Sequence, residues 1–272
     1  MSEEDVIKRT SSPSTTASLA EDFRRLGCRA GMVLLVHSSL SSIGWVVGGA
    51  AAVILALEEV VRPFGTIVMP THSGDYSDPS GWVDPPVPES WWEGIRRSLP
   101  PFDPDLTPTR GMGRVPECFR GQEGVLRSRH PQFSFAAWGE RSIEILTDHS
   151  YDFGLGDDGP LGRIYALEGW VLLLGVDHSR NTSLHLAEFR AHYPTKREVA
   201  CSAPVLVEGH RRWKSYNEVN YDSSDFGRIG DAFEEHQKQQ VLRGRIGQAD
   251  SRLFPQRQCV DYAVGWIERH RR

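Results

Sequence analysis

The amino-acid sequence predicts an α/β fold in which a mostly parallel central sheet is flanked by helices, and three observations support this. Helix and strand patterns alternate along the chain. The strongest strand candidates are continuous apolar runs, which suits strands covered on both faces. The composition is that of an ordinary globular protein, with 39% hydrophobic and 25% charged residues among 272, enough for one large domain.

The chain begins with a polar stretch, residues 1–16, which has no apolar periodicity and is expected to be a disordered extension. A single domain is expected over residues 17–272. Within it, apolar residues at helical spacing predict a first helix that ends at Gly27, before a strand in the run MVLLVHSS. A second helix, GGAAAVILALEEVV, then leads to the strand TIVMP.

The middle of the chain, residues 71–135, is rich in Pro, Trp and Asp and is expected to be a long irregular insert with one short helix. Irregular stretches of this length inside a domain usually build a binding site. Downstream, WVLLLGV is the strongest buried strand and leads into a helix capped by Asn181 or Thr182. The C-terminal part is expected to form a hairpin with a Glu208–Gly209 turn, followed by a terminal helix.

Charge, hydropathy and cysteine spacing exclude several classes of function. The net charge of −5 argues against a nucleic-acid partner and suits a cationic small molecule. No apolar run reaches the roughly 20 residues that span a bilayer, and the first residues lack a signal peptide, so we expect no membrane association and a cytoplasmic location. Four widely separated cysteines predict neither disulfides nor a zinc site: Cys28, Cys118, Cys201 and Cys259.

A histidine and a glutamate three residues apart follow the strongest strand. On a helix, His185 and Glu188 share one face, so the carboxylate can orient the imidazole and raise its basicity. The end of a buried strand is also where open α/β sheets place their chemistry. The pair is therefore a candidate general base with its orienting group, and a surface pair that only supports the helix is the alternative.

A metal site competes with this interpretation, because His178, His185 and Glu188, together with Asp177, are all ligand types. The two histidines are seven residues apart, unlike the i, i+4 pair of zinc-binding helices. We expect no metal, and a metal-dependent hydrolase is kept as an alternative.

Two loops predict a site for an anionic or polar ligand. The turn VHSSLSSIG follows the first strand and offers hydroxyl groups and backbone amides. The loop PTRGMGRVPE places Arg110 beside Gly111 and Gly113, which combines a positive charge with close backbone approach. A capped turn and a structural loop are the alternatives. A nucleophile at Ser38 or Ser39 is disfavoured because the GxSxG elbow is missing.

The stretch Gly154–Gly159 matches the GxGxxG dinucleotide-binding pattern in its letters only. It follows no predicted strand, and the carboxylates of Asp157 and Asp158 would face the pyrophosphate. The sequence therefore argues against a dinucleotide-binding fold. An acidic loop of this kind suits a cationic ligand or is a plain surface turn.

Six motifs, taken together, give the sequence a resemblance to a known family. From about Ala17 to Ile267, the chain resembles the aminoglycoside N3-acetyltransferases in the order and spacing of LVHSSLSSIGWVVGGAAAVI, TIVMPTHSGDYSDP, PTRGMGRVPE, RSRHPQFSFAAWG, GPLGRIYALEGWVLLLGV and NTSLHLAE. The resemblance implies that family's own α/β fold, which is distinct from the GNAT acetyltransferases. It also implies transfer of acetyl from acetyl-CoA to the 3-amino group of the 2-deoxystreptamine ring of aminoglycoside antibiotics, a reaction that gives antibiotic resistance.

The resemblance also implies roles for individual residues. The His of the HLAE motif is the family's general base with the Glu beside it, and these match His185 and Glu188. The HSSLSSIG and TRGMG motifs line the coenzyme A channel in the family. The residues implied to contact the cofactor are His37, Ser38, Ser39, Ser41, Arg110, Gly111, Met112, Gly113 and Phe135.

The expected mechanism is direct attack of the amine on the thioester in a ternary complex, without an acyl-enzyme. Thr182 or a backbone amide near Ser38 is the candidate oxyanion donor. A non-antibiotic amine as acceptor and a binding protein without catalysis are alternatives, and a homodimer is left open. Acidic residues are expected to bind the other ammonium groups of the aminoglycoside, and the candidates are Asp75, Asp78, Asp157 and Asp158.

Overall fold

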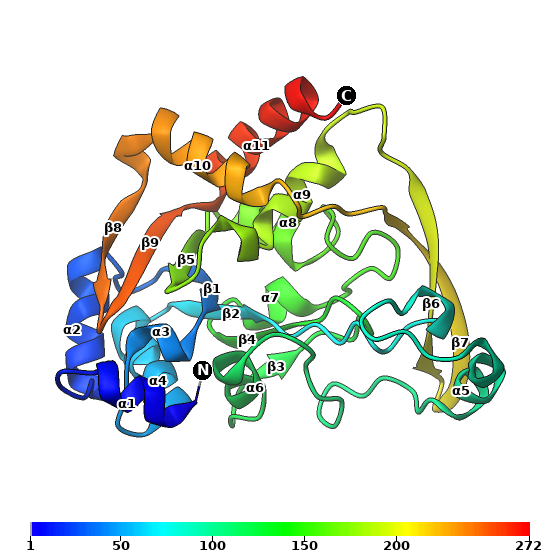
Figure 1. The fold of residues 1–272 in the computed structure, drawn as a ribbon, viewed down its shortest axis with the longest axis horizontal. Coiled ribbons are helices and arrows are strands. Elements are labelled where there is room, and N and C mark those ends of the chain that lie inside the picture. Colours follow the sequence, from blue (N-terminus) through cyan, green and yellow to red (C-terminus); the bar gives the residue numbers. More distant parts are fainter. Residues whose placement is uncertain (1) are drawn as a thin grey trace.

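A computed structural model describes residues 2–272, which fold around a central seven-stranded sheet (Figure 1). The strands follow the order β3-β4-β2-β1-β5-β9-β8 across the sheet. Their bounds are β1 Val33–Ser38, β2 Thr66–Pro70, β3 Leu126–Arg127, β4 Phe135–Gly139, β5 Trp170–Leu174, β8 Leu242–Ile246 and β9 Ala249–Pro255.

The α/β fold class is confirmed, and the sheet is mixed. Strand β1 pairs in parallel with β2 on one side and with β5 on the other. Strands β4 and β3 on one flank, and β9 and β8 on the other, are antiparallel to their neighbours. Long helical connections make the three central strands parallel, as the apolar runs predict, whereas β8 and β9 form a short-turn hairpin that must be antiparallel.

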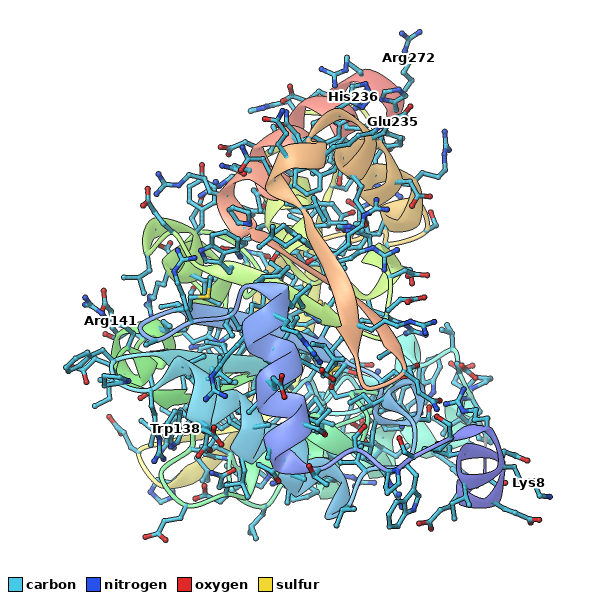
Figure 2. The ribbon with its side chains drawn as sticks, turned by 90° about the vertical axis from the view of Figure 1, so that its left-hand side faces the viewer. Lys8, Trp138, Arg141, Glu235, His236 and Arg272 are labelled. Atoms are coloured by element: carbon cyan, nitrogen blue, oxygen red, sulfur yellow. The ribbon has the colours of Figure 1, made fainter. Side chains whose placement is uncertain are left out.

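Both faces of the sheet are covered, as the continuous apolar runs require. Alternate residues of β1 enter different cores: Leu34 and Val36 pack on one face, while Val33 and Leu35 pack on the other. Helix α2 crosses the first face beside the β8–β9 hairpin (Figure 2). The first face carries α2 Thr16–Leu26, α4 Gly49–Val61 and α6 Arg114–Arg120, and the second carries α7 Ser142–Leu146, α8 Pro160–Ala166, α9 Ser183–Arg190, α10 Phe226–His236 and α11 Gln256–His270.

A separate two-stranded sheet stands at one side of the molecule (Figure 1). Strands β6 Glu198–Val207 and β7 His210–Val219 pair antiparallel over their whole length, and Glu208 and Gly209 make the turn, so the predicted hairpin is confirmed. Helix α5, Trp92–Ser98, lies near the tip of this hairpin, and Arg211 donates to the carbonyl oxygen of Leu99 at 2.9 Å. The short turns are α3 Leu40–Ile43, η1 Pro79–Gly81, η2 Glu89–Trp91, η3 His178–Arg180 and η4 Lys238–Gln240.

The N-terminal segment differs from the predicted disordered extension over residues 1–16, of which Met1 lies outside the described residues. Helix α1, Glu3–Arg9, begins with a capping box formed by Ser2 and Asp5. The amide of Trp45 donates to the Thr10 hydroxyl at 2.9 Å, and Ser14 forms a bridge with Val46. These partners are more than thirty residues away, so the local polar composition gave no sign of them.

None of the helices within residues 2–272 is long and apolar enough to cross a membrane.

A close helix contact gives a matched pair of substitutions in α10. A Cβ atom at Gly230 would overlap the ring of the buried His178, whereas a Cβ at Gly227 would meet no heavy atom within 4 Å. Gly230→Ala is therefore expected to lower the free energy of unfolding by about 1–3 kcal/mol. Gly227→Ala should raise it by at most about 1 kcal/mol, from helix propensity. Urea denaturation measures both, and equal effects would contradict the packing described here.

Candidate active site

The candidate site lies where the three parallel strands end at one edge of the sheet. Strand β1 ends with His37 and Ser38, β2 is followed by Thr71, and β5 is followed by Gly175. The amide of Ser39 donates to the carbonyl oxygen of Leu174 at 2.9 Å, which ties the first of these ends to the last. This edge is the usual ligand position in open α/β sheets.

A cavity of about 510 Å³ opens at this edge and gathers most of the residues expected to contact the cofactor. A second cavity shares its wall at Leu40 and Arg114, so the two form one groove along the loop before α6. Thr182, the candidate oxyanion donor, also lines the first cavity. The expected cofactor residues in its lining are His37, Ser38, Ser39, Ser41, Gly111, Met112 and Gly113.

The glycines of the TRGMG motif have a conformational reason to be there. Gly111 and Gly113 have φ angles of 71° and 89°, in the left-handed region that other residues rarely adopt. A Cβ atom at Gly113 would lie at an ordinary contact distance of 3.9 Å from the carbonyl oxygen of Ser38, and one at Gly111 would meet no heavy atom within 4 Å. The φ angles, and not a lack of space, therefore favour glycine at these two positions.

Two buried polar atoms of the groove lack hydrogen-bond partners. They are Nε2 of His37 and Oγ of Ser38. Burial lowers the pKa of His37 to about 3, with smaller contributions from the neighbouring His178 and His185, so its ring is neutral at pH 7. Buried polar groups are nearly always hydrogen-bonded in native proteins, so these atoms fit a polar ligand in the groove.

The predicted histidine and glutamate pair is present on α9. Nδ1 of His185 lies 2.6 Å from Oε2 of Glu188, and the glutamate side chain is fully buried while the imidazole keeps partial exposure. The other glutamate oxygen, Oε1, accepts from the amide of Asp222 at 2.8 Å and from Nη1 of Arg271 at 2.5 Å. Because these donors keep Glu188 an acceptor, the shared proton resides on Nδ1, and Nε2 of His185 has a free lone pair.

Two aromatic rings hold the imidazole of His185 from the side. The ring centroid of Tyr221 lies 4.9 Å from that of His185, in an edge-to-face arrangement, and that of Phe226 lies 4.8 Å away. Both follow the hairpin strand β7, so the loop after the hairpin completes the base. These rings pack against the sides of the imidazole, while the bond from Nδ1 to Glu188 sets its orientation.

Two of the expected cofactor residues lie outside the cavity lining. Phe135 is fully buried in β4, where its ring packs edge-to-face on His72 with centroids 5.3 Å apart, because its side chain points to the core face of the strand. Phe135 therefore does not line the cavity, and its contact with the cofactor stays a prediction from the motif. Arg110 is exposed and donates to the carbonyl oxygen of Asp84 at 3.0 Å.

The four acidic candidates for acceptor binding have different surroundings. Asp78 is held by Nε and Nη2 of Arg96, both at 2.8 Å, and this pairing lowers its pKa strongly. Asp157 is paired with Arg190, whereas Asp158 is exposed. Asp75 has one buried oxygen, Oδ1, without a hydrogen-bond partner. The structure therefore does not gather the four carboxylates into one cluster.

The ligand set of the metal alternative is not assembled. Nε2 of His178 pairs with Oε1 of Glu234 at 3.0 Å, and the ring stacks on Phe254. Asp177 caps the turn η3 through the amide of Ser179. Within residues 2–272, no group of three His, Cys, Asp or Glu side chains could hold a metal ion.

A histidine–glutamate pair near a groove with unpartnered polar atoms is an arrangement that suits a group-transfer enzyme. The chain belongs to the aminoglycoside 3-N-acetyltransferase family, whose sequence model matches residues 35–268. The aminoglycoside N(3')-acetyltransferase-like protein YokD of Bacillus subtilis is 48% identical over 263 residues, which cover 96% of this chain and 95% of that protein. Aminoglycoside N(3)-acetyltransferase VII of Streptomyces paromomycinus is 35% identical, with coverage of 98% and 96%.

Solved structures agree with this assignment. The crystal structure of YokD superimposes with a TM-score of 0.95 at 46% identity, covering 98% of both chains. A structure described as AAC-IIIb binary with CoASH has a TM-score of 0.84 at 31% identity, covering 95% of this chain and 97% of that one. One described as AAC-VIa bound to sisomicin has a TM-score of 0.84 at 29% identity, covering 96% and 99%. The resemblance stated from the motifs is confirmed, and the chain is an acetyltransferase by family.

Sequence reasoning missed three residues that surround the base. Tyr221 and Arg271 contact the pair directly, and Glu218 lies buried on β7 just before Tyr221. For Tyr221, the polar run NYDSSDF after the hairpin was a local sign of a loop that could reach the site. Arg271 and Glu218 reach the site only through the tertiary fold.

Glu218 is a buried carboxyl group in an unusual state. Its Oε1 accepts from the amide of Gly154 at 2.8 Å, and Oε2 is buried without a hydrogen-bond partner. Burial raises its pKa from 4.5 to about 7, although the bond from Gly154 opposes the shift. A carboxyl group of this kind is largely protonated in the folded protein below neutral pH.

This shift predicts a specific pH dependence of stability. Between about pH 4.5 and 7 the folded chain keeps a proton on Glu218 that the unfolded chain has released, so the stability due to this group falls as pH rises. Glu218→Gln cannot ionise, so its stability relative to the wild type should rise by up to about 3 kcal/mol across that range.

Denaturation of both proteins at a series of pH values measures this difference. Glu198→Gln, exposed on the neighbouring strand β6, is the control and should show no such trend. A difference for Glu218→Gln that is independent of pH would contradict the raised pKa.

Proposed function

We propose that this chain transfers acetyl from acetyl-CoA to the 3-amino group of the 2-deoxystreptamine ring of an aminoglycoside. The observation that carries the proposal is the pair of His185 and Glu188, which follows Thr182 of the cavity wall on α9 and lies close enough to His37 of that wall to lower its pKa. Relatives whose structures are described with CoASH and with sisomicin support the two ligand classes.

His185 acts as the general base in this proposal. A protonated amine has no lone pair for attack, so its proton must leave before or during bond formation. Nε2 of His185 accepts that proton, and Glu188 stabilises the imidazolium that results through the short bond to Nδ1. Tyr221 and Phe226 keep the ring aimed while it does so.

The groove is the proposed site of acetyl-CoA, which supplies the activated acetyl thioester when bound. The unpartnered atoms of His37 and Ser38 offer hydrogen bonds to a polar chain, and the bare backbone of Gly111 and Gly113 allows close approach. Ser39 and Ser41 belong to the same wall. Arg110 stands outside the cavity lining and is assigned to the cofactor through the family motif.

Direct transfer in a ternary complex is the proposed route. The serine hydroxyl groups of the groove have no histidine as hydrogen-bond partner: that of Ser42 donates to Ser39 at 2.8 Å. An activated nucleophile needs such a base within hydrogen-bond reach. Thr182, which lines the same cavity, is the proposed oxyanion donor.

Acidic groups are proposed to bind the remaining ammonium groups of the acceptor. Asp75 and Asp158 are the more available candidates, because Asp75 has an unpartnered Oδ1 and only a 3.8 Å ion pair between Oδ2 and Arg110, and Asp158 is exposed. Asp78 and Asp157 would have to exchange an arginine partner for the ligand. A non-antibiotic amine is the second candidate acceptor, since the 48% identical relative is described only as acetyltransferase-like.

Replacement of the base tests the mechanism. His185→Ala should lower kcat by about 10²–10⁴-fold, because proton transfer from the amine loses its acceptor. Glu188→Gln should have a smaller effect, since it removes the orienting charge and leaves the imidazole. Thiol release from acetyl-CoA measures the rates, with unchanged circular dichroism as the control. Near-normal turnover of His185→Ala would remove this residue from the mechanism.

The acceptor is tested with a panel of aminoglycosides that have or lack the 3-amino group. A mass gain of one acetyl group, about 42 Da by composition, confined to acceptors with that amine is the expected result of base-assisted attack at one nitrogen. Binding of acetyl-CoA without turnover of any of them would assign the chain a different amine.

A further inference from the structure

An arginine just beyond the last helix reaches back to the buried glutamate of the catalytic pair. Nη1 of Arg271 donates to Oε1 of Glu188 at 2.5 Å, across 83 residues of sequence. The arginine side chain is itself only 10% exposed. It follows α11 directly, beyond residue 268 where the family model's match ends.

The guanidinium group is fixed on its other side as well. Asp225 holds it by two bonds, from Nε to Oδ2 at 2.9 Å and from Nη2 to Oδ1 at 2.5 Å. Nη2 also donates to the carbonyl oxygen of Asp222 at 2.7 Å. These partners raise the pKa of Arg271 above its ordinary value, so the group is always charged.

The buried carboxylate depends on this arrangement. Glu188 is completely buried, and an ionised carboxylate in such a place needs an opposite charge and hydrogen bonds on both oxygens. Its Oε2 serves His185, so Oε1 alone can receive the compensating charge. Arg271 supplies that charge, and the amide of Asp222 supplies the other bond.

We propose that Arg271 is a positioning residue of the acetyltransferase reaction, which keeps the carboxylate of Glu188 aimed at Nδ1 of His185. The inference rests on the proposed function for its kinetic consequence only. Without the guanidinium group, Oε1 of Glu188 loses a hydrogen-bond donor and the carboxylate turns toward another one. This movement weakens the bond to Nδ1 that orients the imidazole, so Nε2 is no longer held in place as the proton acceptor.

The experiment compares Arg271→Ala and Arg271→Lys with Arg272→Ala as the matched control. Arg272 is exposed and points away from the molecule at the end of α11 (Figure 2). Arg271→Ala is expected to lower kcat by about 10–100-fold, as for other groups that orient a functional side chain. The KM for acetyl-CoA should stay unchanged. Arg271→Lys keeps the positive charge but loses the planar guanidinium group with its paired donors, so its kcat should lie between those of the wild type and Arg271→Ala.

Chemical rescue separates positioning from a general loss of folding. Methylguanidinium, at concentrations far below those that unfold proteins, should restore part of the kcat of Arg271→Ala and none of that of His185→Ala. Wild-type kcat in both Arg271 variants would overturn the proposal. A loss of kcat that only follows the unfolded fraction, without rescue, would overturn it too.

A spectroscopic signature decides the matter independently of turnover. The short bond between His185 Nδ1 and Glu188 should give a downfield proton resonance, identified by its absence in His185→Ala. The resonance should persist in Arg272→Ala and be lost or shifted upfield in Arg271→Ala and Arg271→Lys. An unchanged resonance in both Arg271 variants contradicts the positioning role. This result needs no acetylation of any acceptor, because the resonance is measured without turnover. Failure of the wild type to acetylate any amine would instead contradict the proposed function.

Discussion

The burial of one carboxylate, Glu188, is the constraint on which the rest of the site depends. A charge with no exposed surface is costly unless each oxygen has a partner, so residues from three separate parts of the chain must converge there. Helix α9 contributes His185, the loop after the hairpin contributes Asp222, and the end of α11 contributes Arg271. The pair of His185 and Glu188 is local in sequence, but the partners that hold it come together only in the complete fold.

The parallel strands of the central sheet determine where the groove lies. Because β1, β2 and β5 are parallel, their C-terminal ends meet at one edge, and the loops that follow can share a cavity. Positive φ angles at Gly111 and Gly113, which glycine adopts without strain, let a third loop line that edge. A rigid core thus presents irregular loops in fixed positions, which leaves His37 and Ser38 with unpartnered polar atoms facing a ligand site.

The sequence could predict those features that depend on neighbours along the chain. The apolar runs identified the strands β1, β2 and β5. The spacing of His185 and Glu188 identified the pair, because side chains three residues apart on a helix are neighbours. The hairpin turn at Glu208 was equally local. Features that depend on distant partners were missed: the docking of helix α1, the antiparallel edge strands, and the contact of Arg271. Phe135 was assigned from its motif, although the alternation of side chains in β4 turns it into the core.

The docked N-terminal segment has a consequence for how such enzymes can diverge. Val6 and Ser41 line one cavity beside the groove, and Thr10 ties helix α1 to the loop at Trp45. Arg9 also bonds to the carbonyl oxygen of Ser41. The N-terminal segment therefore builds the outer wall beside the groove, whereas the His185–Glu188 pair lies on α9. Exchange of this segment between relatives would reshape the groove entrance and leave the pair on α9 in place.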